Sequence, residues 1–427
     1  MIKIYRYGEV ENSKIFARTQ MPTNVEQTVA DIIADVVSNG DSALYKYNKK
    51  FDRTTAPLEV TQDEIDAAYA SVDPELISVM EEAAANIRDF HSRQKRNSFI
   101  INDKPGIITG QKVLPIQRAG IYVPGGTAAY PSTVLMDTIP AQIAGVKEII
   151  MTTPASGGEL NPVILAAAKI SGVTRIFRVG GAQAIAALAY GTETIPRVDK
   201  IVGPGNAFVA EAKKQVYGRV SIDMIAGPSE ILIVADGTND PRIVAADMLS
   251  QAEHDKFATA VLVTDSEELA KGVSEELEKQ LAVLPREEIA RASIDNNGKI
   301  IIADCVERAI DIANEIAPEH FELCVDNPFD YLDQIRNAGS VFLGKNCPEA
   351  LGDYFAGPNH TLPTSGTARF YSPLSVDDFT KKMQYSYYTK SALAKAADKI
   401  ARFAGEEGLD AHARSVLVRG EEKEDRE

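Results

Sequence analysis

Five histidines occur in the chain, and four of them lie close in sequence to carboxylates or amides. Such groups matter together because imidazole, carboxylate and amide side chains can transfer protons and bind metal ions. The four groups are Gln251 with His254, Glu319 with His320, Asp353 with His360, and Glu407 with His412. The fifth histidine, His91, lies in RDFHSRQKR, which we interpret as an exposed helix end without a functional role.

Gln251 and His254 directly follow an apolar helical run. Residues three apart on a helix share a face, with Cβ atoms about 5–6 Å apart, so both side chains could bind one metal ion. The same pattern is typical of a helix C-terminus, where a histidine interacts favourably with the helix dipole. Glutamine is also an uncommon zinc ligand, so the spacing leaves both interpretations open.

Asp353 and His360 lie in GDYFAGPNHTLPTSG, whose glycines and prolines predict an irregular loop. Loops of this kind position functional groups on a rigid scaffold. Asp353 could supply a carboxylate oxygen to a cation, and His360 could contact a substrate. Stabilisation of the turn by the Asp and Asn side chains is the alternative.

Glu319 and His320 follow Pro318, which ends the preceding helix. Two neighbouring groups with different pKa values suit a reaction that needs more than one base, provided that both lie in the turn before the next strand. A structural histidine bonded to its neighbour is the alternative. Glu407 and His412 lie on either side of a glycine break near the C-terminus, where polar residues are usually just solvated.

The elements that must position these groups alternate between helices and apolar strands, which is typical of parallel sheets covered on both faces. We predict an α/β fold with two tandem Rossmann-like globules. Residues 1–105 form an N-terminal helical region, 106–236 the first globule, 237–372 the second, and 373–427 a helical C-terminal segment. GIITGQKVLPI and AGIYVPGG are expected to pair as a hairpin.

Three glycine-rich turns, at 123–131, 178–186 and 202–208, each follow an expected strand and open a helix. Free amides and the helix dipole favour a phosphate or another anion at such places. None of these turns has the G-x-G-x-x-G pattern, so spacing alone does not establish dinucleotide binding.

The net charge of −16 argues against nucleic acids and anionic membranes as partners. No apolar run is long enough to cross a bilayer of about 30 Å, and MIKIYRYGEVENSK contains no signal-like segment, so we expect a cytoplasmic protein. Cys305, Cys324 and Cys347 are too few and too irregularly placed for a disulfide framework or a thiolate zinc site. Of the three, only Cys347 could be a thiol that takes part in aldehyde oxidation. The alternative, which we favour, is that it is a small apolar residue that fills space.

Many segments, in order and spacing, closely resemble the histidinol dehydrogenase family over essentially the whole chain. They are IYVPGGTAAYPSTVLM, VGGAQAIAALAYGT, DKIVGPGNAFVAEAKKQV, DMIAGPSEILIVAD, SQAEHD, APEHFEL, GDYFAGPNHTLPTSGTARF and EEGLDAH. The resemblance implies oxidation of L-histidinol to L-histidine through L-histidinal, with two NAD reduced in sequence at one zinc-dependent site.

The resemblance also implies roles for individual residues. The zinc ligands, for one ion per subunit, would be Gln251, His254, Asp353 and His412. His320 would take the alcohol proton, and Glu319 would activate the water that hydrates the aldehyde. Ser229, His360 and Glu407 match substrate contacts, in addition to the zinc ligands and the proton-transfer pair. Tyr122, Gln183 and Asn206 match NAD contacts.

The family is a homodimer whose C-terminal segment reaches across to the partner, so Glu407 and His412 would complete the neighbour's site and a monomer would be inactive. Three alternatives remain open. One is a dehydrogenase of the same fold that acts on another amino alcohol or diol, although the presence of Glu319, His360 and Glu407 together argues against it. The others are a zinc hydrolase and a binding protein without catalytic activity.

Overall fold

The computed structural model describes residues 2–18, 25–125 and 130–421. The chain forms two compact units, of which the first spans Met1–Gln94 and Ile116–Phe379. The second unit combines Lys95–Pro115 with Thr380–Glu427. Among the described helices, none has the length and apolar character needed to cross a membrane.

The first unit contains a six-stranded parallel sheet. Its strands, in spatial order, are β1 (Lys3–Arg6), β11 (Lys299–Ile302), β10 (Thr259–Thr264), β9 (Glu230–Ala235), β12 (His320–Cys324) and β13 (Ser340–Leu343). Alternate strand residues pack on one face against α9 (Pro241–Ala252), α10 (Glu267–Leu281) and α11 (Glu287–Asn297), and on the other face against α12 (Val306–Ile316). Every residue of β9 and β12 is therefore buried.

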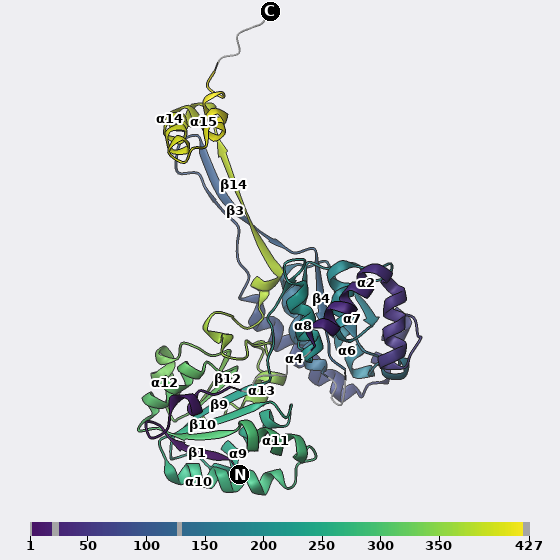
Figure 1. The fold of residues 1–427 in the computed structure, drawn as a ribbon, viewed down its shortest axis with the longest axis vertical. Helices are drawn as coiled ribbons and strands as arrows, with labels where there is room; N and C mark the ends of the chain where they lie inside the picture. The colour runs from purple at the N-terminus through teal and green to yellow at the C-terminus, as the bar shows by residue number, and fades with distance from the viewer. Residues whose placement is uncertain (1, 19–24, 126–129, 422–427) are drawn as a thin grey trace, which may run out of the picture. The chain divides into compact units, whose positions relative to one another are not determined.

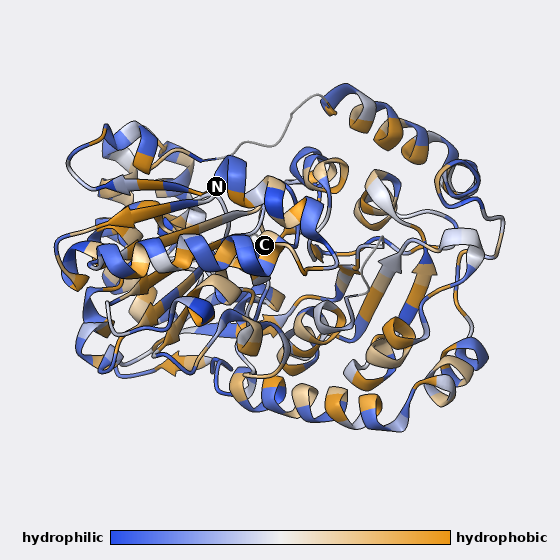
Figure 2. Cartoon of the chain, turned by 90° about the horizontal axis from the view of Figure 1, so that it is seen from below, coloured by the Kyte–Doolittle hydropathy of each residue, from blue (hydrophilic) through white to orange (hydrophobic). Residues whose placement is uncertain are grey.

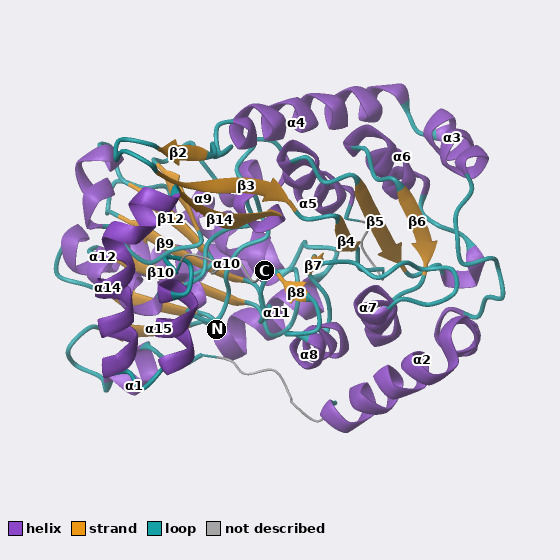
Figure 3. Cartoon of the chain, turned by 90° about the horizontal axis from the view of Figure 1, so that it is seen from above, coloured by secondary structure: helices purple, strands orange, loops and turns teal. Residues whose placement is uncertain are grey.

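A five-stranded parallel sheet lies in the same unit. Its spatial order is β6 (Arg175–Arg178), β5 (Glu148–Thr153), β4 (Arg118–Tyr122), β7 (Lys200–Val202) and β8 (Ser221–Ile222). One face packs against α4 (Pro74–Ser92), α5 (Pro131–Ala144) and α6 (Pro162–Ser171); the other packs against α2 (Glu26–Tyr47), α7 (Gly181–Tyr190) and α8 (Ala207–Val216). Figure 3 shows these helices on both sides of the strands, and Figure 2 shows the strands mostly hydrophobic and the helices banded.

The predicted α/β class with two parallel sheets is confirmed. In each sheet the strand order reverses once, between β4 and β7 and between β9 and β12. Ligands of open α/β sheets bind at such reversal points, which directs attention to the loops around them.

Shorter elements complete the first unit. They are α1 (Asn12–Ile15), a π-helix (Asn48–Asp52), α3 (Gln62–Ser71), α13 (Glu349–Tyr354) and 3-10 turns at Ser156–Gly158, Pro328–Gln334, Thr367–Arg369 and Val376–Phe379. Thr61 and Glu64 form a capping box that opens α3.

The second unit is an antiparallel sheet with two helices. Its strands are β2 (Phe99–Ile101), β3 (Ile107–Pro115) and β14 (Thr380–Tyr388), and its helices are α14 (Lys390–Glu406) and α15 (Asp410–Leu417). β3 and β14 run as a long ribbon that leads to these helices (Figure 1).

Two expectations about these strands are wrong. β3 does not pair with β4 as a hairpin: it pairs with β2 and β14, whereas β4 pairs with β5 and β7. The segment 380–388, expected to be helical, is strand β14. Its tyrosines favour a strand, and pairing with the distant β3 provides the hydrogen bonds that a helix would otherwise supply.

The expected domain boundaries at residues 105, 236 and 372 differ from the strand pairing. β1 and β9 both belong to the six-stranded sheet, although one lies in the expected helical region and the other in the expected first globule. Residues 95–115 join the C-terminal segment rather than either neighbouring region. Local patterns cannot show these boundaries, because they depend on pairing between segments that are far apart in sequence.

His91 is buried, not exposed as the sequence suggested. It continues the buried stripe of α4 formed by Met80, Ala84 and Ile87, at helical spacing. Its Nδ1 lies 2.8 Å from Oε1 of Gln94, and its Nε2 has no hydrogen-bond partner among the described residues. Burial therefore lowers the pKa of His91 below its ordinary value of 6.5.

This burial predicts a pH-dependent loss of stability. The unfolded chain takes up a proton at His91 as the pH falls through about 6.5, while the folded chain does not, so folding loses up to about 1.4 kcal/mol per pH unit until the lower folded pKa is reached. The variant His91→Asn keeps a donor near Gln94 but does not titrate. Denaturant unfolding of both proteins between about pH 7 and pH 5 should show a shallower decline for the variant. Parallel profiles would contradict the assignment.

Candidate active site

A cavity of about 580 Å³ lies within the first unit. From the six-stranded sheet it is lined by Ser229, which precedes β9, and by Glu319 and His320, at the start of β12. From the five-stranded sheet it is lined by 203–206, which follow β7. The cavity therefore lies at the amino-terminal ends of β9 and β12 in the six-stranded sheet and at the carboxyl-terminal end of β7 in the five-stranded sheet. In both sheets this is beside the reversal of strand order.

Glu319 and His320 are both held by the backbone of Glu230 on the neighbouring strand β9. Oε2 of Glu319 accepts a hydrogen bond of 2.9 Å from the Glu230 amide, and Nδ1 of His320 lies 3.0 Å from the Glu230 carbonyl oxygen. Oε2 of Glu319 is 3.6 Å from Nδ1 of His320. The expectation that both residues lie in the turn before the strand is wrong for His320, which begins β12, but both side chains line the cavity.

The Glu230 carbonyl determines which nitrogen of His320 is free. A carbonyl oxygen only accepts, so Nδ1 must carry the proton, and Nε2 then has a lone pair in the neutral ring. Nε2 is buried, has no hydrogen-bond partner among the described residues, and lies 3.8 Å from Oδ1 of Asp353. His320 is thus prepared to accept a proton at Nε2.

Burial raises the pKa of Glu319 well above that of an ordinary glutamate. A general base is most effective when its pKa lies near the working pH, which for a carboxylate requires such an upward shift. The environment of Glu319 is therefore suited to a base that takes a proton from water.

Gln251 and His254 are brought to the same cavity, at the end of α9 and in the turn after it. Oε1 of Gln251 is buried without a hydrogen-bond partner in the described part of the chain. Burial lowers the pKa of His254, which favours the neutral imidazole that binds metal ions. An unpaired amide oxygen and a neutral imidazole are what a metal site needs, and the helix-cap alternative does not account for them.

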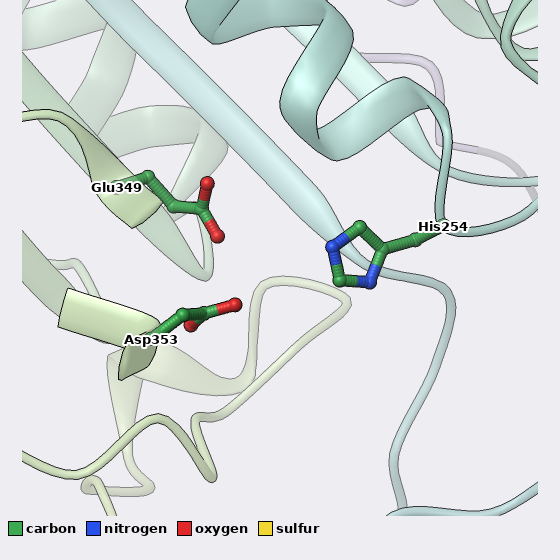
Figure 4. Close-up of side chains that lie close together, drawn as sticks. All are labelled: His254, Glu349 and Asp353. Atoms are coloured by element: carbon green, nitrogen blue, oxygen red, sulfur yellow. The ribbon is translucent and has the colours of Figure 1, made fainter. Parts of the chain in front are cut away.

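Asp353 joins these groups from α13, together with Glu349, which the sequence-based prediction missed. Donor atoms of His254, Glu349 and Asp353 all lie within 4.8 Å of one another, and Figure 4 shows the three side chains pointing toward a common space. Glu349 and Asp353 are four residues apart in one helix, so this spacing could have revealed Glu349. The nitrogen and oxygen donors fit zinc, manganese or cobalt.

His360 lies on the loop after α13, with Nδ1 3.7 Å from Oδ1 of Asp353. Burial would lower the pKa of His360, but hydrogen bonding and the charge of Asp353 outweigh it, and the net shift is upward. In turn, burial would raise the pKa of Asp353, but the hydrogen bond and the charge of His360 hold it below the usual range.

The His360 loop is fixed to the other sheet layer by α5. The Asn359 side chain donates to the Met136 carbonyl at 2.7 Å, and the Thr361 hydroxyl donates to Asp137 at 2.7 Å. These bonds set the position of His360 in the cavity from both sides of its own backbone.

The three residues expected to contact NAD lie at the carboxyl edge of the five-stranded sheet. The Tyr122 hydroxyl accepts a hydrogen bond of 3.1 Å from the Gly181 amide, and Asn206 caps α8 through Oδ1 and lines the cavity. Gln183 is buried in α7. Residues 126–129 of the first glycine-rich turn lie outside the described residues.

The turn after β7 requires a glycine at position 203. Its φ is 116°, and a Cβ there would lie 2.1 Å from the carbonyl oxygen of Tyr122. The glycine therefore lets the turn pack directly against the end of β4, at the N-terminal side of α8.

Glu407 and His412 belong to the second unit, where both are exposed, and neither is among the residues that line the cavity. The three cysteines are also absent from the described lining residues. Cys324 is buried in β12, and burial raises the pKa of its thiol. The geometry therefore gives no support to Cys347 or another thiol as a nucleophile.

Comparisons with known proteins agree over nearly the whole chain. A family model described as histidinol dehydrogenase matches residues 17–420. The histidinol dehydrogenase of Geobacter metallireducens is 54% identical over 416 residues, which cover 96% of this chain and 95% of the relative. That of Clostridium acetobutylicum is 54% identical over 426 residues, covering 98% and 99%. The crystal structure of histidinol dehydrogenase from Elizabethkingia anophelis, 42% identical, superposes with a TM-score of 0.93 and covers 98% of both chains.

Proposed function

This chain belongs to the histidinol dehydrogenase family and is an oxidoreductase, and we propose that it oxidises L-histidinol to L-histidine through L-histidinal, with zinc and NAD. The observation that carries this proposal is Nε2 of His320, which has no hydrogen-bond partner among the described residues and lies near Asp353, a proposed metal ligand, in a cavity that the turn at 203–206 also lines. The proposed proton acceptor, the proposed metal ligands and the turn proposed to bind the nucleotide therefore line the same cavity.

In the first oxidation His320 acts as the base. As the carbinol carbon loses its hydride to NAD, Nε2 of His320 takes the hydroxyl proton, and the alcohol becomes the aldehyde. The hydrogen bond from Nδ1 to the Glu230 carbonyl keeps the ring oriented and stabilises the imidazolium that forms.

In the second oxidation Glu319 acts as the base. It takes a proton from the water that adds to the aldehyde, while the protonated His320 returns its proton to the former carbonyl oxygen, which gives the gem-diol. As the gem-diol passes its hydride to a second NAD, Nε2 of His320 takes one hydroxyl proton, and the product is the carboxylic acid. The backbone amide of Glu230 holds one oxygen of Glu319, which leaves the other to face the water.

The side chains that would hold zinc are Gln251, His254 and Asp353, together with His412 of the partner subunit. The unpaired Oε1 of Gln251 supports this assignment. Bound zinc would supply positive charge and a template that orients the substrate. Ser229, His360 and the partner subunit's Glu407 would contact the substrate around it.

A homodimer is part of the proposal because the second unit exposes most of its apolar residues. Three residues of β2 and several of β14 are exposed, among them Tyr387 at 57% and Ile100 at 60%. Ala392 is the one described apolar residue of this unit that is buried. A small unit that exposes so many of its apolar residues is typical of a protein that buries them in an interface. A cytoplasmic location, expected from the sequence, also remains part of the proposal.

Replacing Tyr122 with phenylalanine tests the nucleotide edge. The Gly181 amide, which is only partly buried, would lose its acceptor, at a cost of about 1 kcal/mol, the low end of the range for an unsatisfied donor. Steady-state kinetics should show the KM for NAD raised about 10-fold, with the KM for histidinol little changed. An equal rise in both constants would indicate a general structural defect and count against this placement of NAD.

The activity itself is tested with purified protein, L-histidinol, NAD and zinc. We expect about two NADH for each histidinol consumed, with L-histidine as the product. One NADH per substrate would mean that oxidation stops at the aldehyde. If protein with confirmed bound metal forms no NADH, the proposal is wrong. That result would favour another amino alcohol as the substrate, or a hydrolase activity.

A further inference from the structure

Glu230 is the first residue of β9, and its backbone supports both proposed bases. Its amide donates a hydrogen bond to Oε2 of Glu319, and its carbonyl oxygen lies 3.0 Å from Nδ1 of His320. The pairing of β9 with β12 begins only at the next residue, Ile231, which lies opposite His320. Glu230 therefore lies at the end of that pairing, where strands open most easily, and its position determines where both bases are held.

The side chain of Glu230 is anchored by Arg18. Nη1 of Arg18 donates a hydrogen bond of 2.6 Å to Oε1 of Glu230, and only 28% of the arginine side chain and 11% of the glutamate side chain are exposed. A cavity beside the pair, of about 20 Å³, has room for about one water molecule, so bulk water screens little of their attraction. Burial raises the pKa of Glu230, and the charge of Arg18 and its hydrogen bond oppose this rise.

The same guanidinium also contacts the turn that leads into Glu319. Nη2 of Arg18 donates a long hydrogen bond of 3.5 Å to the carbonyl oxygen of Ala317, two residues before Glu319. Ala317 has a left-handed backbone with a φ of 51°, which is uncommon for a residue with a Cβ and needs support from its surroundings. Arg18 therefore contacts β9 and the turn before β12, the two segments that carry the bases and their support.

Arg18 is itself held in place from two sides. The ammonium of Lys299, on β11, donates to the carbonyl oxygens of Ile15 and Ala17 at 3.0 and 2.9 Å, which fastens the residues that precede Arg18 to the sheet. A Cβ at Gly366 would lie 2.9 Å from Nη2 of Arg18, so the backbone of this glycine packs closely against the guanidinium. These contacts fix the arginine in a way that an ordinary surface ion pair lacks.

We propose that Arg18 is a positioning residue for both oxidations. It holds the side chain of Glu230 and thereby fixes the backbone groups that orient Glu319 and His320. Without the guanidinium, a buried carboxylate loses its counter-ion and must take up a proton or move toward another partner. The start of β9 can then shift, and a displacement of about 1 Å at a reacting group costs on the order of 10²-fold in rate. This inference rests on the proposed function, because it concerns the two bases assigned there.

The test measures the single-turnover rate of each oxidation in full-length Arg18→Met, starting from L-histidinol and from L-histidinal. Methionine keeps an unbranched apolar stem but cannot pair with the carboxylate of Glu230. We expect both rates to fall by about 30- to 100-fold, with zinc content and the KM for NAD within about twofold of wild type.

Arg291→Met is the matched control. Arg291 lies on α11 of the same unit with a similar side-chain exposure of 34%, and it pairs with Glu278 and Glu287 but does not line the cavity. This control should change both rates less than about twofold, because partly exposed ion pairs away from the site contribute little.

Two further variants separate positioning from a general structural role. Arg18→Lys keeps a cation for Glu230 but loses the fork that also contacts Ala317, so it should recover about 10-fold of the lost rate. Arg18→Met/Glu230→Gln no longer buries an unpaired charge, so it should be about fivefold or more faster than Arg18→Met. A double variant as slow as the single variant, or slower, would overturn the inference.

Arg18→Lys alone decides the question if Arg18→Met does not fold. It should slow both oxidations by about threefold or more at an unchanged KM for NAD, and wild-type rates would overturn the inference. Wild-type rates in Arg18→Met, or a fall in only one oxidation, would also overturn it and leave the proposed function intact. Wild-type protein that forms no NADH from L-histidinol would instead contradict the proposed function.

Discussion

His320→Asn should lower kcat for histidinol oxidation by about 10²–10⁴-fold, the contribution of a positioned general base. The asparagine amide can still donate to the Glu230 carbonyl, as Nδ1 does in the wild type, but it offers no group at the position of Nε2. The change therefore removes the proton acceptor and keeps the local hydrogen bond. Rapid-mixing measurement of the first NADH formed gives the rate of the affected step.

Zinc content and histidinol affinity serve as controls for this variant and should stay close to the wild-type values. Glu319→Gln provides a contrasting result, because its base acts in the second oxidation. The ratio of NADH to histidinol consumed should fall from about two toward one in that variant. A full rate in His320→Asn would exclude His320 as the base.

Mixing two inactive proteins should restore activity if the site is shared between subunits. His320→Ala lacks the base and His412→Ala lacks a proposed zinc ligand, yet one site of a mixed dimer combines intact parts of both. After random exchange about half of the dimers are mixed and one of their two sites is complete, so activity should reach about a quarter of wild type.

Subunit exchange must be verified separately, for example with differently tagged chains. His320→Ala mixed with His320→Ala/His412→Ala is the matched control, since no combination of these chains restores a complete site. Absence of recovery after confirmed exchange would show that each site is built from one chain. The dimer itself is checked by light scattering of the purified wild-type protein.

The two parallel sheets could be predicted because their strands are nearly continuous apolar runs between helices. The central position of β9 in the six-stranded sheet could not be predicted, because it depends on pairing with β10 and β12. β14 was mistaken for helix for the same reason: its partner β3 is remote in sequence. The burial of His91, in contrast, was available from its spacing to Ile87 and Ala84.

The parts of the site that come from residues close in sequence could be predicted. The spacing of Gln251 and His254 allowed a shared metal ion as one of two interpretations, and both side chains line the cavity. The contacts of the Glu230 backbone with Glu319 and His320 could not be predicted from the sequence, because they depend on the register between β9 and β12. Glu349 was missed although its spacing to Asp353 on α13 was visible. Only the fold shows that its carboxylate points toward His254.

The most direct test of this account is a crystal structure with L-histidinol and zinc bound, with anomalous scattering measured at the zinc absorption edge. We predict the strongest anomalous peak within about 2.0–2.3 Å of donor atoms of Gln251, His254 and Asp353. The histidinol hydroxyl should lie within about 2.6–3.2 Å of Nε2 of His320. A peak away from these residues, or histidinol outside the cavity, would contradict the assignment of the site.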